Sequence, residues 1–211
     1  MNLFALIVLV MLLFWIVQAI RLAFSKEKSW WKFGLNLVAS SCLIVGAFGF
    51  FGSALSSTGA MNWLPDSFEW PVRGSDNALQ LPDGEYVVPH TASGRVQIYG
   101  ADLTYIRGWT INASGGVFAL APSQEANFYI FTARNDKKYE YDVLGNLVSS
   151  TNYRGPYPAE HNSHQSIKLD VSPFLWPFTD PFAAWLFAAL GIALAILSNK
   201  LKVRGQRYNV S

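Results

Sequence analysis

The residues best suited to chemistry form one short run, Glu160-His161-Asn162-Ser163-His164. A carboxylate beside a His-x-x-His pair has the donor types that zinc and copper prefer, so Glu160, His161 and His164 are candidate metal ligands. The run lies in a stretch rich in Pro, Gly and Ser, and that composition favours a solvated loop as the alternative. The sequence therefore predicts either a small metal site here or an exposed loop.

Other reactive groups have no motif around them. Cys42 is the only cysteine and lies inside an apolar segment, where we expect a small packing residue rather than a reactive thiol. His90 follows a proline and is expected in a turn on the surface. The chain contains no nucleophile elbow, P-loop, Rossmann glycine fingerprint or Cys-x-x-Cys pair. We predict that the protein is not an enzyme and has no cofactor.

The elements that position these residues are dominated by three apolar segments, each long enough to cross a hydrocarbon core of roughly 30 Å. The expected organisation is a membrane helix at 1–24, a basic loop at 25–32, a second helix at 33–55, an irregular connector at 56–80, a β domain at 81–172, an interfacial segment with a third helix at 174–198, and a basic tail at 199–211. A cleaved signal peptide is disfavoured for the first segment, because its basic residues follow the apolar run instead of preceding it.

Charge predicts the orientation of these helices. The first loop and its flanks carry four Lys and Arg, and so does the tail, whereas residues 56–172 carry eight against twelve Asp and Glu. Because short basic loops stay in the cytoplasm, the N-terminus and the β domain are expected outside, in the periplasm if the protein belongs to a bacterial inner membrane. The basic residues are then membrane flanks that contact lipid head groups, and nucleic acid is not an expected partner.

Tryptophan positions agree with this arrangement, since Trp is enriched where helices leave a membrane. Trp30 and Trp31 lie beside lysines at the expected inner boundary. Trp63, Trp70 and Trp176 are expected at the outer boundary. The third helix is expected to start at Thr179-Asp180-Pro181, because a polar N-cap followed by proline at the first helical position favours helix initiation.

Small residues recur along the second and third helices, and such faces let helix backbones approach closely in lipid. The candidate packing residues are Cys42, Gly46, Gly49, Ser53, Ala184, Ala188, Gly191 and Ala195. These faces are expected to pack either on each other or on a neighbouring membrane protein. The first helix lacks such a stripe and is bulky all round.

The middle of the chain predicts an antiparallel all-β domain. Short β-branched and aromatic runs alternate with turn residues: GEYVVP, RVQIYG, LTYIRGWTI, GVFALAP, NFYIFTA, KKYEYDV and NLVSS. Residues 95–99 alternate between polar and apolar, as a half-buried strand does. Leu144-Gly145-Asn146 is expected to form a tight hairpin turn.

Two parts of this region repeat each other. Tyr86 and Tyr129, like Val96 and Tyr139, are separated by 43 positions, which is the period of a propeller blade. At Arg95 to Tyr99 and at the Gly145-Asn146 hairpin, residues 84–150 resemble NHL-type β-propeller repeats. Two blade-like units are too few to close a ring, so we expect a small sheet or sandwich built from blade-like hairpins. The resemblance implies binding of proteins or other ligands.

These features favour a non-catalytic accessory or assembly subunit of a larger membrane complex, docking through its helices and contacting partner proteins outside. The first alternative is an extracytoplasmic sensor or binding protein for metal or glycan. The second is a membrane-anchored hydrolase.

Overall fold

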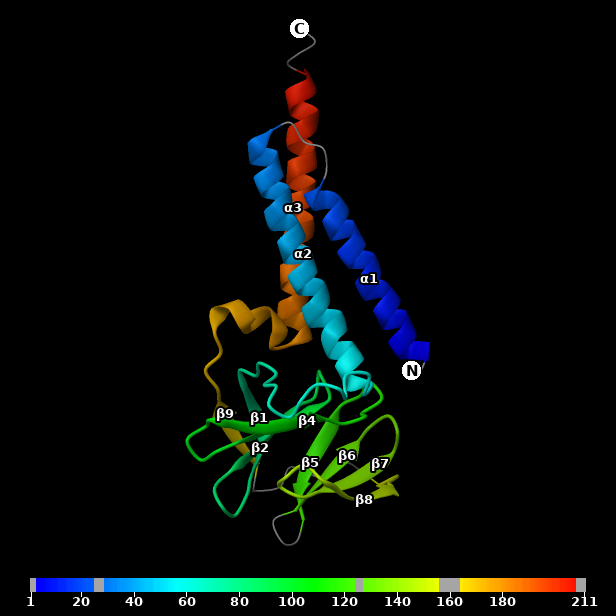
Figure 1. Ribbon diagram of the computed structural model, residues 1–211, viewed down its shortest axis with the longest axis vertical. Coiled ribbons are helices and arrows are strands. Elements are labelled where there is room, and N and C mark those ends of the chain that lie inside the picture. Colours follow the sequence, from blue (N-terminus) through cyan, green and yellow to red (C-terminus); the bar gives the residue numbers. More distant parts are fainter. Residues whose placement is uncertain (1–2, 25–28, 124–126, 156–163, 208–211) are drawn as a thin grey trace.

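The computed structural model describes residues 3–24, 29–123, 127–155 and 164–207. Three helices lie at one end of the molecule and a β domain lies at the other (Figure 1). The helices are α1 (Leu3–Ala23), α2 (Trp30–Ser57) and α3 (Pro181–Arg207), with a short 3-10 helix, η1 (Pro173–Phe178), before α3. The strands are β1 (Gly74–Gln80), β2 (Tyr86–His90), β3 (Arg95–Tyr99), β4 (Tyr105–Thr110), β5 (Phe118–Pro122), β6 (Phe128–Thr132), β7 (Lys137–Tyr141), β8 (Leu147–Asn152) and β9 (His164–Lys168).

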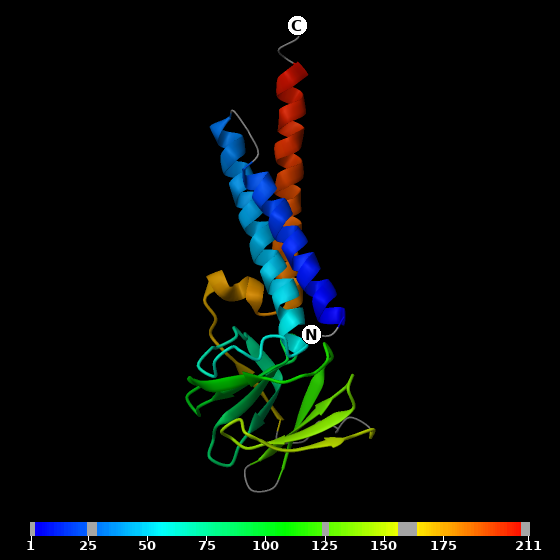
Figure 2. The same ribbon diagram turned by 45° about the vertical axis from the view of Figure 1, so that its right-hand side comes forward.

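All three α-helices contain stretches that are long and apolar enough to cross a membrane. The start of α1, the end of α2 and the start of α3 lie on the side of the β domain, as both ribbon views show (Figures 1 and 2). The expected start of the third helix is confirmed: Pro181 is its first residue, and the backbone N–H of Ala183 donates to Asp180 Oδ1 over 2.8 Å. A side-chain cap of this kind satisfies one of the helix's free N–H groups.

The small-residue faces of α2 and α3 pack on each other. A Cβ added to Gly46 would lie 2.6 Å from the backbone nitrogen of Ala188, and one added to Gly191 would lie 2.8 Å from the carbonyl oxygen of Ala39. A Cβ added to Gly49 would lie 2.6 Å from the Pro177 carbonyl oxygen of η1 and 2.8 Å from the Cβ of Ala184. Any larger residue at these glycines would push the helices apart. Ser53 is buried on the same helix, whereas Cys42 and Ala195 are half-buried.

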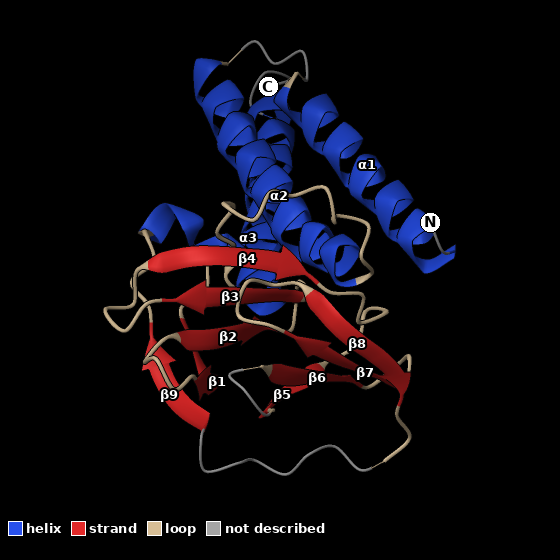
Figure 3. Cartoon of the chain, turned by 60° about the horizontal axis from the view of Figure 1, so that its bottom comes forward, coloured by secondary structure: helices blue, strands red, loops and turns tan. Residues whose placement is uncertain are grey.

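Among the described residues, nine antiparallel strands form two sheets, in the orders β4-β3-β2-β1-β9 and β5-β6-β7-β8 (Figure 3). The sheets share one apolar core. From the first sheet and its adjoining loops it takes Leu79, Leu81, Val87, Val96, Ile98, Ile111 and Ala113, and from the second Phe118, Leu120, Phe128, Ile130 and Tyr141. Apolar residues alternate along the strands because successive side chains point to opposite faces. The β domain is therefore held together by packing between two sheets.

Strand β1 lies within the segment 56–80 that we expected to be irregular. It pairs with β2 and also with β9. In the pairing with β9, Ala78 lies opposite Gln165 and Ser75 opposite Ile167, and the register shifts between Ser75 and Ala78. The sequence GSDNALQ has no β-branched or aromatic residue, so local propensity does not indicate a strand. Its partners supply the pairing instead, and the irregular connector shrinks to residues 58–73.

Each sheet contains four strands that follow one another in the chain, β1 to β4 and β5 to β8, and β9 adds to the edge of the first. Tyr86 is the first residue of β2 and Tyr129 is the second residue of β6, and these are the second strands of the two sets. Val96 and Tyr139 lie in the third strands, β3 and β7. The turn between β7 and β8 contains Gly145 with φ of +87°, a conformation that favours glycine. The resemblance to NHL repeats stays a prediction.

Candidate functional site

The predicted metal ligands fall largely outside the described residues. Glu160 and His161 are not described, and His164 begins β9 with only its backbone described. Among the residues that the structure describes, no group of three His, Cys, Asp or Glu side chains is placed to hold a metal ion. The metal site at 160–164 stays a prediction.

His90 is buried, with 6% of its surface exposed, and the expectation of a surface turn is wrong. It ends strand β2, and its Nε2 lies 2.8 Å from the carbonyl oxygen of Thr179. A carbonyl only accepts, so Nε2 carries the proton and Nδ1 accepts from Ser93 Oγ at 2.6 Å. Burial lowers the pKa of His90, and the Thr179 carbonyl and the Asp180 carboxylate oppose that shift only in part. A neutral histidine thus joins the β domain to the start of α3.

Trp70 is also buried inside the protein, with 6% exposed, and its place at the outer membrane boundary stays a prediction. Its indole stacks on the ring of His90 at 6.0 Å, and its Nε1–H donates to the Phe178 carbonyl at the end of η1 over 3.0 Å. Its place in the connector is held by Gln97 of β3, which accepts from the Trp70 N–H at 2.6 Å and donates to the Trp70 carbonyl at 3.0 Å. The other predicted interface residues, Trp30, Trp31, Trp63 and Trp176, are exposed.

Arg95 fixes the connector from the same strand. It is fully buried on the face of β3 opposite the shared core, and its Nη2 donates to the carbonyls of Pro65, Phe68 and Gly108 at 2.7 to 3.0 Å. The guanidinium also lies 5.4 Å from the centre of the Phe68 ring, a cation–π contact. A buried charge is tolerated when hydrogen bonds replace its lost water, and here two acceptors belong to the connector and the others to β4.

A third residue of β3 completes this contact. The Tyr99 hydroxyl donates to Glu69 Oε1 at 2.9 Å and receives a hydrogen bond from Gln97 Nε2. Burial raises the pKa of the Tyr99 hydroxyl, with a further rise from the Glu69 carboxylate. Arg95, Gln97 and Tyr99 together bind connector residues 65–70, so the outer face of the first sheet is covered by the chain itself.

The end of α2 meets the β domain directly. Gly94, in the turn between β2 and β3, has φ of +65°, and a Cβ there would lie 2.7 Å from Ser57 Cα. The N–H of Gly115 donates to the Ser57 carbonyl over 3.1 Å. With the His90 and Trp70 contacts at α3, the β domain is attached to two helix ends, which restricts its motion relative to the helices.

Strand β8 differs from every other edge of the two sheets. All six of its residues are exposed, including Leu147 at 52% and Val148 at 55%, and Leu144 in the preceding turn is exposed at 55%. It pairs with β7 on one side, and no strand among the described residues pairs with its other side. Alternate N–H and C=O groups of such a strand point away from the sheet, free to pair with another strand.

The other edges carry residues that discourage such pairing. Strand β4 contains Arg107, β9 contains Lys168 and β5 ends in Pro122, and proteins use charge and proline to protect exposed edges. Strand β8, Leu-Val-Ser-Ser-Thr-Asn, has neither. The N–H of Gly108 in β4 is also covered, because it donates to the Asp66 carbonyl of the connector. Hence β8 is the candidate functional site, an apolar open edge that suits a partner strand.

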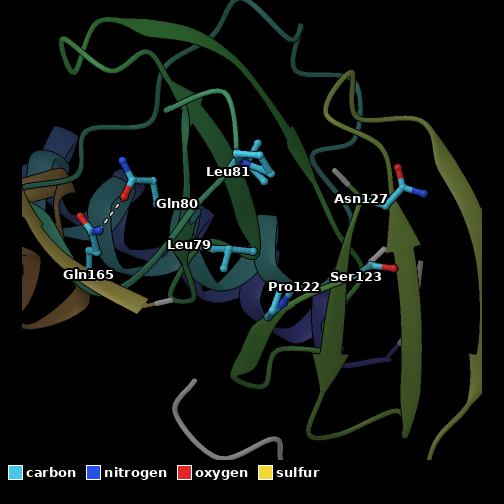
Figure 4. A pocket seen from close by; sticks show the side chains of 8 residues that line it. Leu79, Gln80, Leu81, Pro122, Ser123, Asn127 and Gln165 are labelled. Carbon is cyan, nitrogen blue, oxygen red and sulfur yellow. Dashed lines mark hydrogen bonds between the residues drawn. The ribbon is translucent and has the colours of Figure 1, made fainter. Parts of the chain in front are cut away.

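A pocket between the two sheets was the other candidate (Figure 4). It has a volume of about 280 Å³ and is lined by Leu79, Gln80, Leu81, Pro82, Pro122, Ser123, Asn127 and Gln165. Its polar groups already bind each other or a neighbour: Gln165 Nε2 donates to Gln80 Oε1 at 2.6 Å, and Ser123 Oγ donates to Glu140 Oε1 at 3.0 Å. A ligand would have to displace these hydrogen bonds, so the pocket gives the ligand-binding alternative little support.

Neither a known protein family nor a curated protein matches this chain. Sequence reasoning missed the role of Arg95 and Gln97, although one signal was present: a charged and an amide side chain alternate with Val96 and Ile98 within a single strand.

Proposed function

We propose that this protein is a non-catalytic accessory subunit of a larger membrane protein complex, which presents its β domain to a partner outside the cytoplasm. The length and apolar composition of the three helices support a membrane-spanning role for each. The excess of Lys and Arg in the first loop and in the tail keeps those segments in the cytoplasm, as the inner membrane of a bacterium would require. The acidic β domain then lies on the periplasmic side.

The observation that carries the proposal is the open edge at β8. An extended segment of the partner adds to this strand through backbone hydrogen bonds, and Leu147 and Val148 provide apolar side-chain contacts. Such an edge is a liability in an isolated protein because it also pairs with unintended strands. The edge at β8 has neither charge nor proline, whereas the other three edges have one or the other. This difference supports a specific partner at β8.

The helices contribute anchoring more than recognition. The small-residue faces of α2 and α3 are used within the chain, so they are not the docking faces that the sequence suggested. The firm attachment of the β domain to both helix ends sets the height and direction in which β8 faces its partner. We infer that the partner is bound mainly through the β domain.

The test is co-purification of the tagged full-length chain in mild detergent after cross-linking in its native membrane. We expect a stoichiometric protein partner with the wild type and a loss of about tenfold or more with Val148→Lys, because a charge on an edge strand opposes strand addition. Ile106→Lys on β4 is the matched control, since it adds the same charge at an exposed apolar strand residue and should keep the partner.

A monodisperse monomer, or a partner retained by Val148→Lys, would contradict the proposal. The topology is tested separately by adding protease to spheroplasts. Cleavage within 74–168, with the C-terminal tail protected, is the expected result.

A further inference from the structure

A second hollow lies where the β domain meets the end of α2 and the start of α3. This junction cavity, as we name it, has a volume of about 500 Å³. The wall on the helix side comes from Phe50 and Ala54 of α2, and Pro181 at the start of α3 borders the cavity. The opposite wall comes from loops of the β domain, including Thr91, Val117 and Arg134. The lining of the junction cavity is therefore mostly apolar, with its floor at Phe50 and with Ser57, Thr91 and Arg134 as its polar residues.

Arg134 is the one charged residue among the described residues that line the junction cavity. Its aliphatic stem packs on Gly116, where an added Cβ would lie 2.7 Å from Arg134 Cγ. The Arg134 side chain is exposed, and among the described residues its guanidinium has no ion-pair partner, since the one ion pair joins Arg154 to Asp136. A positive group with a fixed stem and no internal counter-ion suits an anionic ligand.

The junction cavity also lies at a defined level. Ala54 is one helical turn from the end of α2 at Ser57, and Pro181 begins α3. In the topology proposed above, both positions lie where the spans leave the outer side of the membrane, at the depth of lipid head groups. The guanidinium of Arg134 then lies at the level of the lipid phosphates, and the floor at Phe50 lies at the level of the first acyl carbons.

Phe50 also belongs to a second, apolar groove that lies between the helices. Phe50 also lines a hollow of about 200 Å³ between the three helices, with Trp15 of α1, Phe51 of α2 and Trp185 and Ala189 of α3. No charged residue is among the described residues that line this groove. A single side chain, Phe50, thus separates a cationic head-group position from a narrow apolar groove that fits an acyl chain.

From this arrangement we propose that the chain holds one phospholipid of the outer leaflet, with the phosphate bound by Arg134 and one acyl chain lying past Phe50 in the groove between the helices. The inference rests on the proposed membrane topology, but not on the partner at β8. A guanidinium can donate two parallel hydrogen bonds to a phosphate, which gives the site its preference for phospholipid over neutral lipid. The lipid would fill the space beneath the β domain.

The experiment measures lipid binding to the purified full-length protein by native mass spectrometry in a non-ionic detergent. Dioleoyl phosphatidylglycerol is compared with dioleoylglycerol, which has the same chains and no phosphate. We expect the wild type to hold one phosphatidylglycerol about tenfold more tightly than dioleoylglycerol, the usual size of a hydrogen-bonded charge contact. Arg134→Gln should abolish this preference, and Arg107→Gln, which removes the same charge from β4, should keep it.

A second variant tests the groove. Ala189→Phe fills part of the groove and should weaken the binding of both lipids about equally, while the protein stays monodisperse with an unchanged far-UV circular dichroism spectrum. The proposal is overturned if Arg134→Gln keeps the preference for phosphatidylglycerol, or if Ala189→Phe binds both lipids as the wild type does. The latter result would leave the groove to a helix of a partner protein.

The result is separable from the proposed function. Val148→Lys should bind phosphatidylglycerol normally, because β8 does not line the site. If alkaline carbonate removes the wild-type protein from membranes, the topology itself fails. If the protein stays in the membrane but shows no dependence on Arg134, only the lipid inference fails.

Discussion

Strands β3 and β8 belong to the same domain and have similar lengths, five and six residues, yet their surroundings are opposite. Strand β3 contains Arg95 and Gln97 and is buried at every residue. Strand β8 begins with Leu147 and Val148 and is exposed at every residue. Hydropathy alone would predict that Arg95 and Gln97 are exposed and that Leu147 and Val148 are buried. The difference shows that burial here depends on whether another segment covers the strand.

The covering segment is the connector. Its residues 65–70 lie on the outer face of the first sheet, where their backbone groups need hydrogen-bond partners because water is excluded. The polar side chains of β3 supply those partners, so they stabilise the domain although they are buried. No described segment lies along the open edge of β8, and its Leu and Val stay exposed to a partner.

The largest effect is expected from removing Arg95. Arg95→Ala leaves the carbonyls of Pro65, Phe68 and Gly108 without their shared donor, and we expect a loss of about 3 kcal/mol in the free energy of unfolding. Urea denaturation followed by tryptophan fluorescence in detergent measures this loss, since Trp70 is a buried residue of the connector itself. Arg107→Ala, on the neighbouring strand, should change stability by no more than about 0.5 kcal/mol. Equal losses in the two variants would show that the connector contact adds no stability.

An intermediate effect is expected from pH at the junction of the connector and α3. Because the pKa of His90 is lower in the folded protein than its ordinary value of 6.5, the unfolded chain binds more protons as the pH falls below about that value. Stability should be level above pH 7 and should decrease toward pH 5.5, by at most about 1.4 kcal/mol per pH unit. His90→Gln should lack this slope in the same denaturation assay. A wild type with equal stability at both pH values would refute the buried neutral histidine.

The smallest effect on stability is expected at β8. Val148→Lys places a charge in solvent at an exposed position, so the free energy of unfolding should change by less than about 0.5 kcal/mol even if the partner is lost. Val96→Lys in β3 is the contrasting variant, because it buries a charge in the shared core and should prevent stable folding. A large loss from Val148→Lys would mean that β8 is covered within the chain itself.

Much of the β domain could be predicted from local patterns. The seven short runs identified in the sequence correspond to β2 through β8, because β-branched and aromatic residues between turn residues favour strands wherever they lie. Strands β1 and β9 were missed, and they pair with each other across more than eighty residues. Neither has the composition of a strand, so only their pairing identifies them.

The candidate site could be predicted less well, for a related reason. The burial of Trp70 and His90 depends on contacts with Gln97, Phe178 and Thr179, which lie far away in the chain. The exposure of β8 depends on which segments of the folded chain lie beside it, and among the described residues only β7 pairs with it. Neither follows from the period of hydrophobic residues in a window of the sequence.

Three features follow from local sequence: the long apolar helices, the start of α3 at an Asp-Pro cap and the β-rich nature of the middle segment. These properties arise from side-chain hydropathy and backbone preference, which act within a few residues. Tertiary structure decided which helix faces meet, which face of the first sheet is covered by the connector and which edge stays open. Those outcomes depend on distant segments competing for the same surface, and the free energy of that competition appears only when the whole chain is folded.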